Sequence, residues 1–88
     1  MMTIWKSVLS LMSPQTVRMP EGAEILCARE QHEEVCIWFK CDPNKPPVPR
    51  KIIVIGTGHQ HPEIDGRYLG TASLQGGTYM FHVFERTQ

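Results

Sequence analysis

Residues 24–41, EILCAREQHEEVCIWFKC, decide the fold of this chain, because no other segment between glycines and prolines is long enough to require a helix. The first half contains good helix formers, and the apolar residues Ile25, Ala28, Val35 and Cys36 could form one stripe along a helix. The second half contains residues 35–39, VCIWF, whose branched and aromatic side chains favour a β-strand. Composition alone therefore leaves both structures open.

A turn at His32-Glu33 favours two strands over a helix. It creates two apolar cross-strand pairs on one face, Leu26 with Phe39 and Ala28 with Ile37. We therefore predict a β-hairpin over residues 24–41.

The N-terminal part of the chain predicts two further strands, at residues 3–12 and 16–19, the second ending at Pro20. In the first, apolar side chains occupy both faces, so we expect it to be covered on both sides. Its two faces are formed by Trp5, Leu9 and Leu11 and by Ile4, Val8 and Met12.

The C-terminal half predicts a loop, a central strand and a second hairpin. Residues 42–49, DPNKPPVP, indicate a rigid loop, because proline cannot donate to a β-ladder. Residues 52–57 begin with four apolar side chains, which is typical of a strand buried on both faces. Residues 67–75 and 78–85 form the last pair of strands, turned at Gly76-Gly77, which supplies the positive φ of a tight turn.

These elements predict one mainly β domain over residues 1–88, a small antiparallel sandwich or partly open barrel of about six or seven short strands. A chain of 88 residues has a small core, so association into a homo-oligomer is as plausible as a monomer. Surplus aromatic residues fit either a subunit or partner interface or a sandwich that hides both faces.

Charge and cysteine content exclude several classes of function. Nine lysines and arginines balance nine acidic residues, and Arg50-Lys51 is the nearest approach to a basic patch, which argues against binding to nucleic acid. No apolar run approaches the roughly 20 residues of a membrane span, so we expect no membrane partner and a cytosolic protein. Three cysteines, an odd count, fit a reducing compartment better than a disulfide framework.

The densest group of chemically useful residues is the segment 56–62, GTGHQHP, which follows the most apolar strand. Glycines let the backbone approach a ligand, and threonine, histidine and arginine side chains bond phosphate or carboxylate oxygens. The dinucleotide fingerprint is not met, because histidine occupies the place of its third glycine. The candidate residues for binding a ligand or partner are Gly56, Thr57, Gly58, His59, His61, Arg67 and Tyr68.

Metal binding and catalysis receive less support. His59 and His61 are two residues apart and could share a zinc ion from one side of a strand. A third ligand would have to come from Glu63, Asp65, His82 or a cysteine, with no sequence reason to choose. No residue set suggests an enzyme, no cofactor is expected, and His82 on a core strand is better explained by a backbone partner than by a role as a base.

Five segments together resemble a family of short proteins that is common in bacteriophages and prophages. They are residues 3–6 (TIWK), 19–26 (MPEGAEIL), 56–59 (GTGH), 66–71 (GRYLGT) and 81–85 (FHVFE). The resemblance covers nearly the whole chain but brings no activity with it. Where this chain has His32-Glu33 the family has Asn-Gly, which implies a hairpin there. Where this chain reads His59-Gln60-His61-Pro62 the family reads Gly-His-Pro, so the histidine pair is a departure from its pattern.

From these observations we expect a non-enzymatic protein that acts in the bacterial cytoplasm by binding a macromolecular partner, a host or phage protein. The resemblance implies a host-takeover or anti-defence role, as an inhibitor of a host complex. Two alternatives stay open. One is a binder of a nucleotide or another small anion that uses the Gly56 to Arg67 loop between subunits of an oligomer, and the other is a zinc-binding structural module.

Overall fold

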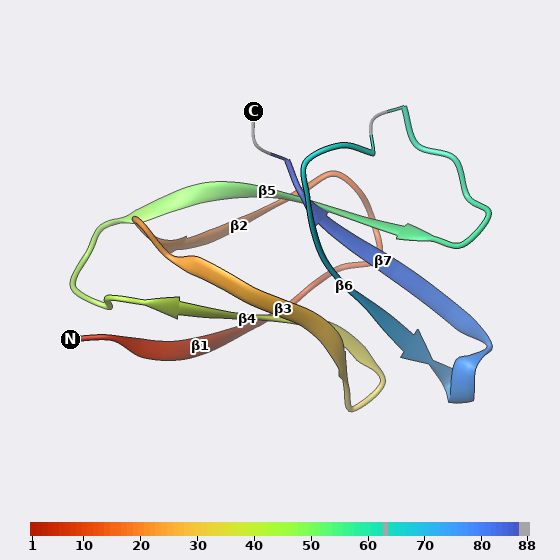
Figure 1. Ribbon diagram of the computed structural model, residues 1–88, viewed down its shortest axis with the longest axis horizontal. Helices are drawn as coiled ribbons and strands as arrows, with labels where there is room; N and C mark the ends of the chain where they lie inside the picture. The colour runs from red at the N-terminus through yellow and green to blue at the C-terminus, as the bar shows by residue number, and fades with distance from the viewer. Residues whose placement is uncertain (63, 87–88) are drawn as a thin grey trace.

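The computed structural model describes residues 1–62 and 64–86, which form seven strands and one short 3-10 turn (Figure 1). The first hairpin and the strands before it give β1 (Thr3–Val8), β2 (Gln15–Pro20), β3 (Glu24–Gln31) and β4 (Glu34–Cys41). The second half gives β5 (Pro47–Gly56), β6 (Arg67–Leu74), the turn η1 (Gln75–Gly77) and β7 (Tyr79–Glu85).

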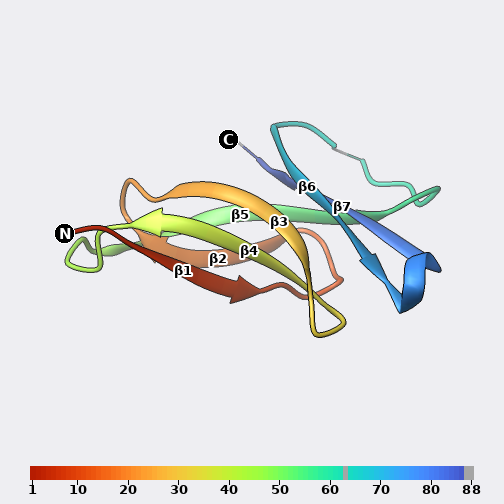
Figure 2. The same ribbon diagram turned by 60° about the horizontal axis from the view of Figure 1, so that its bottom comes forward.

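The strands form two antiparallel sheets, which we call sheet A and sheet B. Sheet A has the order β1-β4-β3, and sheet B has the order β2-β5-β7-β6. The two views show the sheets as two layers, with β3 running beside β6 where the layers approach each other (Figure 2). The prediction of a small, mainly β antiparallel sandwich of six or seven strands is therefore confirmed, and the structure is not a closed barrel.

The decisive segment is a hairpin, as predicted. His32 and Glu33 make the turn with φ values of 53° and 63°, and Ala28 pairs with Ile37. The other predicted pair is wrong, because a β-bulge follows Ile25 and places that residue opposite Phe39. Leu26 lies in the bulge and is 41% exposed.

The first strand is shorter and more exposed than predicted. β1 ends at Val8 instead of residue 12, and its side chains are mostly accessible to solvent. The expectation that both of its faces are covered is wrong, because Ile4 on one face and Trp5 on the other are 57% and 43% exposed at this edge strand of the three-stranded sheet. Leu9, just after the strand, is the residue of this region that enters the core.

The proline-rich segment is only partly a loop. Residues 42–46 form the connection, but Pro47, Val48 and Pro49 already belong to β5 and pair with β2. Among the described residues, this part of β5 has β2 as its one strand neighbour, because pairing with β7 begins at Ile52. Prolines are tolerated where a strand lacks a second neighbour, since no ladder bond is lost there.

The predictions for the C-terminal half are otherwise confirmed, except that Gln75, which the sequence places at the end of a strand, belongs to the turn η1 and has a φ of 50°. Residues 52–55 of β5 are all buried, and the last hairpin turns at Gly76 and Gly77 with φ values of 65° and 98°. The core between the sheets combines side chains from both layers. It contains Ile25, Ile37 and Phe39 from sheet A and Met19, Ile52, Val54, Ala72 and Val83 from sheet B.

Within the part of the chain that the structure describes, no helix is long and apolar enough to cross a membrane.

Candidate functional site

The candidate site lies on the face of sheet B that points away from the core, which we call the outer face. Side chains alternate along a strand, so the residues between the core positions Ile52, Val54 and Val83 point outward. Ladder pairs then bring three strands together on this face. Ile55 lies opposite His82, which in turn lies opposite Thr71, and the next row contains Ile53, Phe84 and Tyr68.

The connection between β5 and β6 joins strands that are two positions apart in sheet B, and its described residue Ile64 lies over this face. It begins beside Phe81 and ends beside Glu85, since Gly56 pairs with the former and Arg67 with the latter. Ile64 of this connection lines a hollow of about 290 Å³ together with Ile55, His82 and Phe84, as well as residues 56–59. The outward side chain of Ile55 is consequently buried, although it does not face the core.

A chain of polar side chains crosses the middle of the outer face. The hydroxyl oxygen of Thr57 lies 2.7 Å from Nε2 of His82, and that of Thr71 lies 3.1 Å from Nδ1 of the same ring. The Tyr68 hydroxyl lies 2.5 Å from the Thr71 hydroxyl. Residues from β6, β7 and the end of β5 are thereby linked through one imidazole.

This polar chain restricts what the imidazole can do. A neutral histidine has one donor and one acceptor nitrogen, so one of its two threonines donates to the ring and the other accepts from it. Hydroxyl groups serve either role by rotating. The His82 ring is therefore held in place by side chains from both neighbouring segments. The expectation of a backbone partner for His82 is wrong, because both ring nitrogens lie against hydroxyl groups.

The glycine-rich turn at the end of β5 lies next to this polar chain. The His59 amide donates to the Gly56 carbonyl at 3.0 Å, which closes the turn. The His59 ring packs on Gly56 so tightly that a Cβ there would lie 2.9 Å from Nδ1 of the ring. Gly56 and His59 line three adjoining hollows of about 290, 290 and 390 Å³.

The structure brings together some of the predicted site residues and separates others. Thr57, Gly58 and His59 lie in one hollow, and Tyr68 joins them through the polar chain. His61 lines the neighbouring hollow on the side of Leu11 and Ser13.

Arg67 lies at the opposite end of sheet B from the glycine turn. Its ladder partner is Glu85, four positions beyond the partner of Gly56, or about 13 Å along β7 at 3.3 Å per residue. The structure therefore does not place Arg67 with the glycine turn.

Thr71 and His82 belong to this site, although the sequence does not predict either of them as a residue that binds a ligand or partner. Their meeting depends on the register of three strands, of which β5 and β6 are separated by the long connection. The alternation of Met80, His82 and Phe84 indicates that they share one face of β7, but it does not predict that Thr71 and Thr57 lie next to His82.

The outer face also exposes large apolar side chains around the polar chain. Ile64, Tyr68 and Met80 are 48%, 55% and 38% exposed. The Tyr68 ring packs on Phe84 with centroids 5.5 Å apart and planes tilted by 58°. Aromatic residues and methionine are enriched on surfaces that bind proteins.

Metal binding on this face can be examined for the described residues. In residues 1–62 and 64–86, no group of three or more His, Cys, Asp or Glu side chains could hold a metal ion. Glu63, one of the possible third ligands, lies outside the described residues. Burial raises the pKa of the Cys36 and Cys41 thiols, which disfavours the thiolate form that binds metals.

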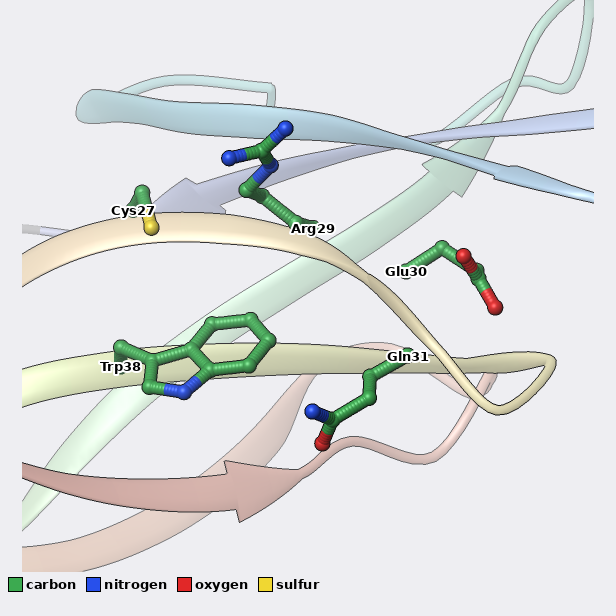
Figure 3. A pocket seen from close by; sticks show the side chains of 5 residues that line it. All are labelled: Cys27, Arg29, Glu30, Gln31 and Trp38. Atoms are coloured by element: carbon green, nitrogen blue, oxygen red, sulfur yellow. The ribbon is translucent and has the colours of Figure 1, made fainter.

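A separate hollow of about 320 Å³ lies on sheet A and was not expected from the sequence. It is lined by Cys27, Arg29, Glu30 and Gln31 of β3 and by Trp38 of the paired strand β4 (Figure 3). The Lys6 ammonium group donates to Oε1 of Gln31 at 2.6 Å, which ties the outer strand β1 to one side of this hollow.

Fold and site together define a small antiparallel β-sandwich with an apolar and hydroxyl-rich outer face. The sequence matches, over residues 1–88, the family described as Domain of unknown function (DUF7352), and the chain belongs to this family. No curated protein and no solved structure matches it.

Proposed function

We propose that this protein is a non-enzymatic binding protein that engages another protein through the outer face of sheet B. The observation that carries the proposal is the arrangement of Ile64, Tyr68 and Met80 around the Thr57-His82-Thr71 polar chain. Apolar anchors beside fixed hydrogen-bonding groups suit a partner that presents an apolar side chain flanked by backbone amides.

The resemblance to bacteriophage and prophage proteins supports a host protein as the partner. The site of action is then the bacterial cytoplasm, and the role is inhibition of a host complex, of the anti-defence or host-takeover type. A balanced charge supports a protein rather than a nucleic acid as the partner.

Co-purification from a bacterial host lysate, followed by mass spectrometry, tests this proposal. The wild-type chain is compared with the double variant Tyr68→Ser/Met80→Ser and with Leu26→Ser, which removes a side chain of similar exposure from sheet A. We expect a host protein in stoichiometric amount that is lost with the double variant and retained with the control. A partner that binds the double variant as well as it binds the wild-type chain contradicts the proposed surface.

A second candidate function is the binding of a small ligand at the glycine turn. It is favoured by the position of Gly56 and His59, which line three adjoining hollows. Calorimetric titration with phosphate and with ATP tests it. Binding that is lost in His59→Ala and retained in Arg67→Ala supports a site at the turn, because Arg67 lies at the other end of the sheet. Absence of heat with both probes argues against an anionic ligand.

A further inference from the structure

The outer edge of sheet A is a second surface with an unusual composition. Among residues 1–62 and 64–86, β1 has β4 as its one strand neighbour, so its other edge carries unpaired backbone groups. Its side chains Ile4, Trp5 and Val8 are 57%, 43% and 49% exposed. β1 contains no proline, and its ladder with β4 shows no bulge. Natural edge strands usually carry several such devices to prevent pairing with another chain, and β1 has one of them, the charged side chain of Lys6.

The register of β1 shows which backbone groups face this edge. The Leu9 amide donates to the Val35 carbonyl at 2.8 Å, so the odd-numbered residues exchange hydrogen bonds with β4. Bonded and non-bonded pairs alternate along an antiparallel ladder. The amide and carbonyl groups of Ile4, Lys6 and Val8 therefore point away from the sheet and are available to a further strand.

We propose that two copies of this chain associate by antiparallel pairing of β1 with β1 of the partner subunit. The two copies of sheet A then form one six-stranded sheet. This inference does not rest on the proposed function, because it concerns the other sheet of the sandwich.

Symmetry restricts the possible registers of this pairing. A two-fold axis perpendicular to the sheet keeps the core faces of both copies on the same side. Residues directly opposite each other point to the same face of a sheet, so the residue at the axis must lie opposite its own copy. The axis through Trp5 places Trp5 opposite Trp5 of the partner subunit and Thr3 opposite Ser7 of the partner subunit. Aromatic pairs and hydroxyl pairs are favourable across strands.

The main alternative register is disfavoured by charge. An axis through Lys6 places Lys6 opposite Lys6 of the partner subunit, and like charges directly opposite each other destabilise a sheet. With the axis through Trp5, the neighbour of Lys6 is Ile4 of the partner subunit. These two residues exchange both backbone hydrogen bonds, because both direct their polar backbone groups to the edge.

The indole of Trp5 supplies the apolar contact between subunits. It stands edge-on against Phe39, with centroids 6.4 Å apart, and leaves part of its surface open. Trp5 occupies a non-hydrogen-bonded position in the proposed pairing, where opposite Cα atoms approach to about 4.5 Å. Each indole thus covers the exposed part of the other.

The first test compares Lys6→Pro with Lys6→Ala by size-exclusion chromatography with light scattering. Both variants lose the bond from Lys6 to Gln31, but only proline also removes the amide that faces the edge. Proline is tolerated at such a position because no bond to β4 is lost. We expect a dimer for the wild-type protein and Lys6→Ala and a folded monomer for Lys6→Pro. A monomeric wild-type protein or a dimeric Lys6→Pro overturns the proposal.

Disulfide cross-linking tests the register and decides the matter if Lys6→Pro fails to fold. It is done in a Cys27→Ser background, because Cys27 is the half-buried thiol whereas Cys36 and Cys41 are buried. Oxidation of a mixture of Thr3→Cys and Ser7→Cys chains is expected to give a covalent dimer that neither variant gives alone. Equal cross-linking of the single variants, or none in the mixture, overturns the pairing through Trp5.

Discussion

Arg50 on β5 and Glu85 on β7 form a two-point ion pair at the edge of the core. Nε of Arg50 donates to Oε2 of Glu85, and Nη2 donates to Oε1 at 3.0 Å. The remaining Nη1 donates to the Ala23 carbonyl at 2.8 Å, just before β3. Arg50 therefore links two strands of sheet B to the start of the hairpin that dominates sheet A.

Loss of this ion pair is expected to lower the free energy of unfolding substantially. Glu85→Gln keeps the shape of the side chain but leaves the Arg50 charge poorly compensated, and the two side chains are only 21% and 11% exposed. We expect the free energy of unfolding in urea to fall by about 2 to 4 kcal/mol, because a charge left buried without its partner is strongly destabilising.

The ion pair between Lys40 and Glu24 provides the matched control. It spans 3.3 Å, but its side chains are 49% and 56% exposed. Glu24→Gln is expected to cost less than about 0.5 kcal/mol, since solvent screens exposed pairs. Similar losses in the two variants would show that the Arg50 pair does not anchor the core.

The close approach of β3 and β6 predicts a strong effect of Gly70→Ala. A Cβ at Gly70, where φ is 152°, would lie 2.3 Å from the Ala28 carbonyl oxygen, so the strands must move apart. We expect a loss of about 2 to 4 kcal/mol in thermal or urea unfolding.

Gly76→Ala separates steric conflict from backbone strain. Gly76 has a φ of 65°, but nothing lies within 4 Å of its virtual Cβ among the described residues. Only the strain of a left-handed residue is expected there, about 1 kcal/mol. If Gly70→Ala were no more harmful than Gly76→Ala, the contact between the two sheets would be looser than described.

Most of the fold could be predicted from local patterns, and the errors have physical causes. The turn at His32-Glu33 followed from cross-strand pairing of apolar residues, and the turn at Gly76-Gly77 followed from backbone freedom. The bulge after Ile25 could not be predicted, because pairing arguments assume an uninterrupted ladder. The exposure of β1 was missed because alternation shows which residues share a face, not whether another layer covers it.

The polar chain on sheet B predicts an ordered set of stability losses. Thr71→Val removes a hydroxyl that contacts both Tyr68 and Nδ1 of His82, whereas Tyr68→Phe removes only the exposed end of the chain. We expect a loss of about 1 kcal/mol for Thr71→Val and less than about 0.5 kcal/mol for Tyr68→Phe, measured by urea unfolding. An equal or larger loss in Tyr68→Phe would contradict the central position of Thr71.

Less of the candidate site than of the fold could be predicted. The glycine turn was recognised because glycine, threonine and histidine are adjacent in the sequence. Thr71 and His82 meet Thr57 only through the ladder of three strands, and such long-range register leaves no local signal. The sequence groups Arg67 with the turn because few residues separate them in the chain, whereas the ladder places Arg67 at the other end of the sheet.

The three cysteines are expected to differ in reactivity. Cys27 is partly exposed, whereas Cys36 and Cys41 are buried, and burial raises the pKa of the latter two thiols. A thiol reagent at neutral pH should therefore modify one cysteine quickly in the folded protein and all three in denaturant. Peptide mapping after brief labelling identifies the site. Rapid labelling of Cys41 in the folded state would show that the core opens more readily than its packing implies.

The raised pKa values also predict a loss of stability at alkaline pH. A thiol whose pKa is higher in the folded state is ionised more readily when the chain unfolds. Its contribution to stability is complete below the ordinary pKa of about 8.5, and it declines as the pH rises through the pKa of the folded state. The free energy of unfolding should accordingly begin to fall as the pH rises past about 8.5. Lysines and tyrosines titrate in the same range, so the informative quantity is the difference between the wild-type protein and Cys41→Ala. That variant starts less stable because it leaves a cavity at a fully buried position, but its stability should decline less steeply with pH. Parallel pH profiles for the two proteins would mean that the Cys41 thiol ionises as easily in the folded chain as in the unfolded one.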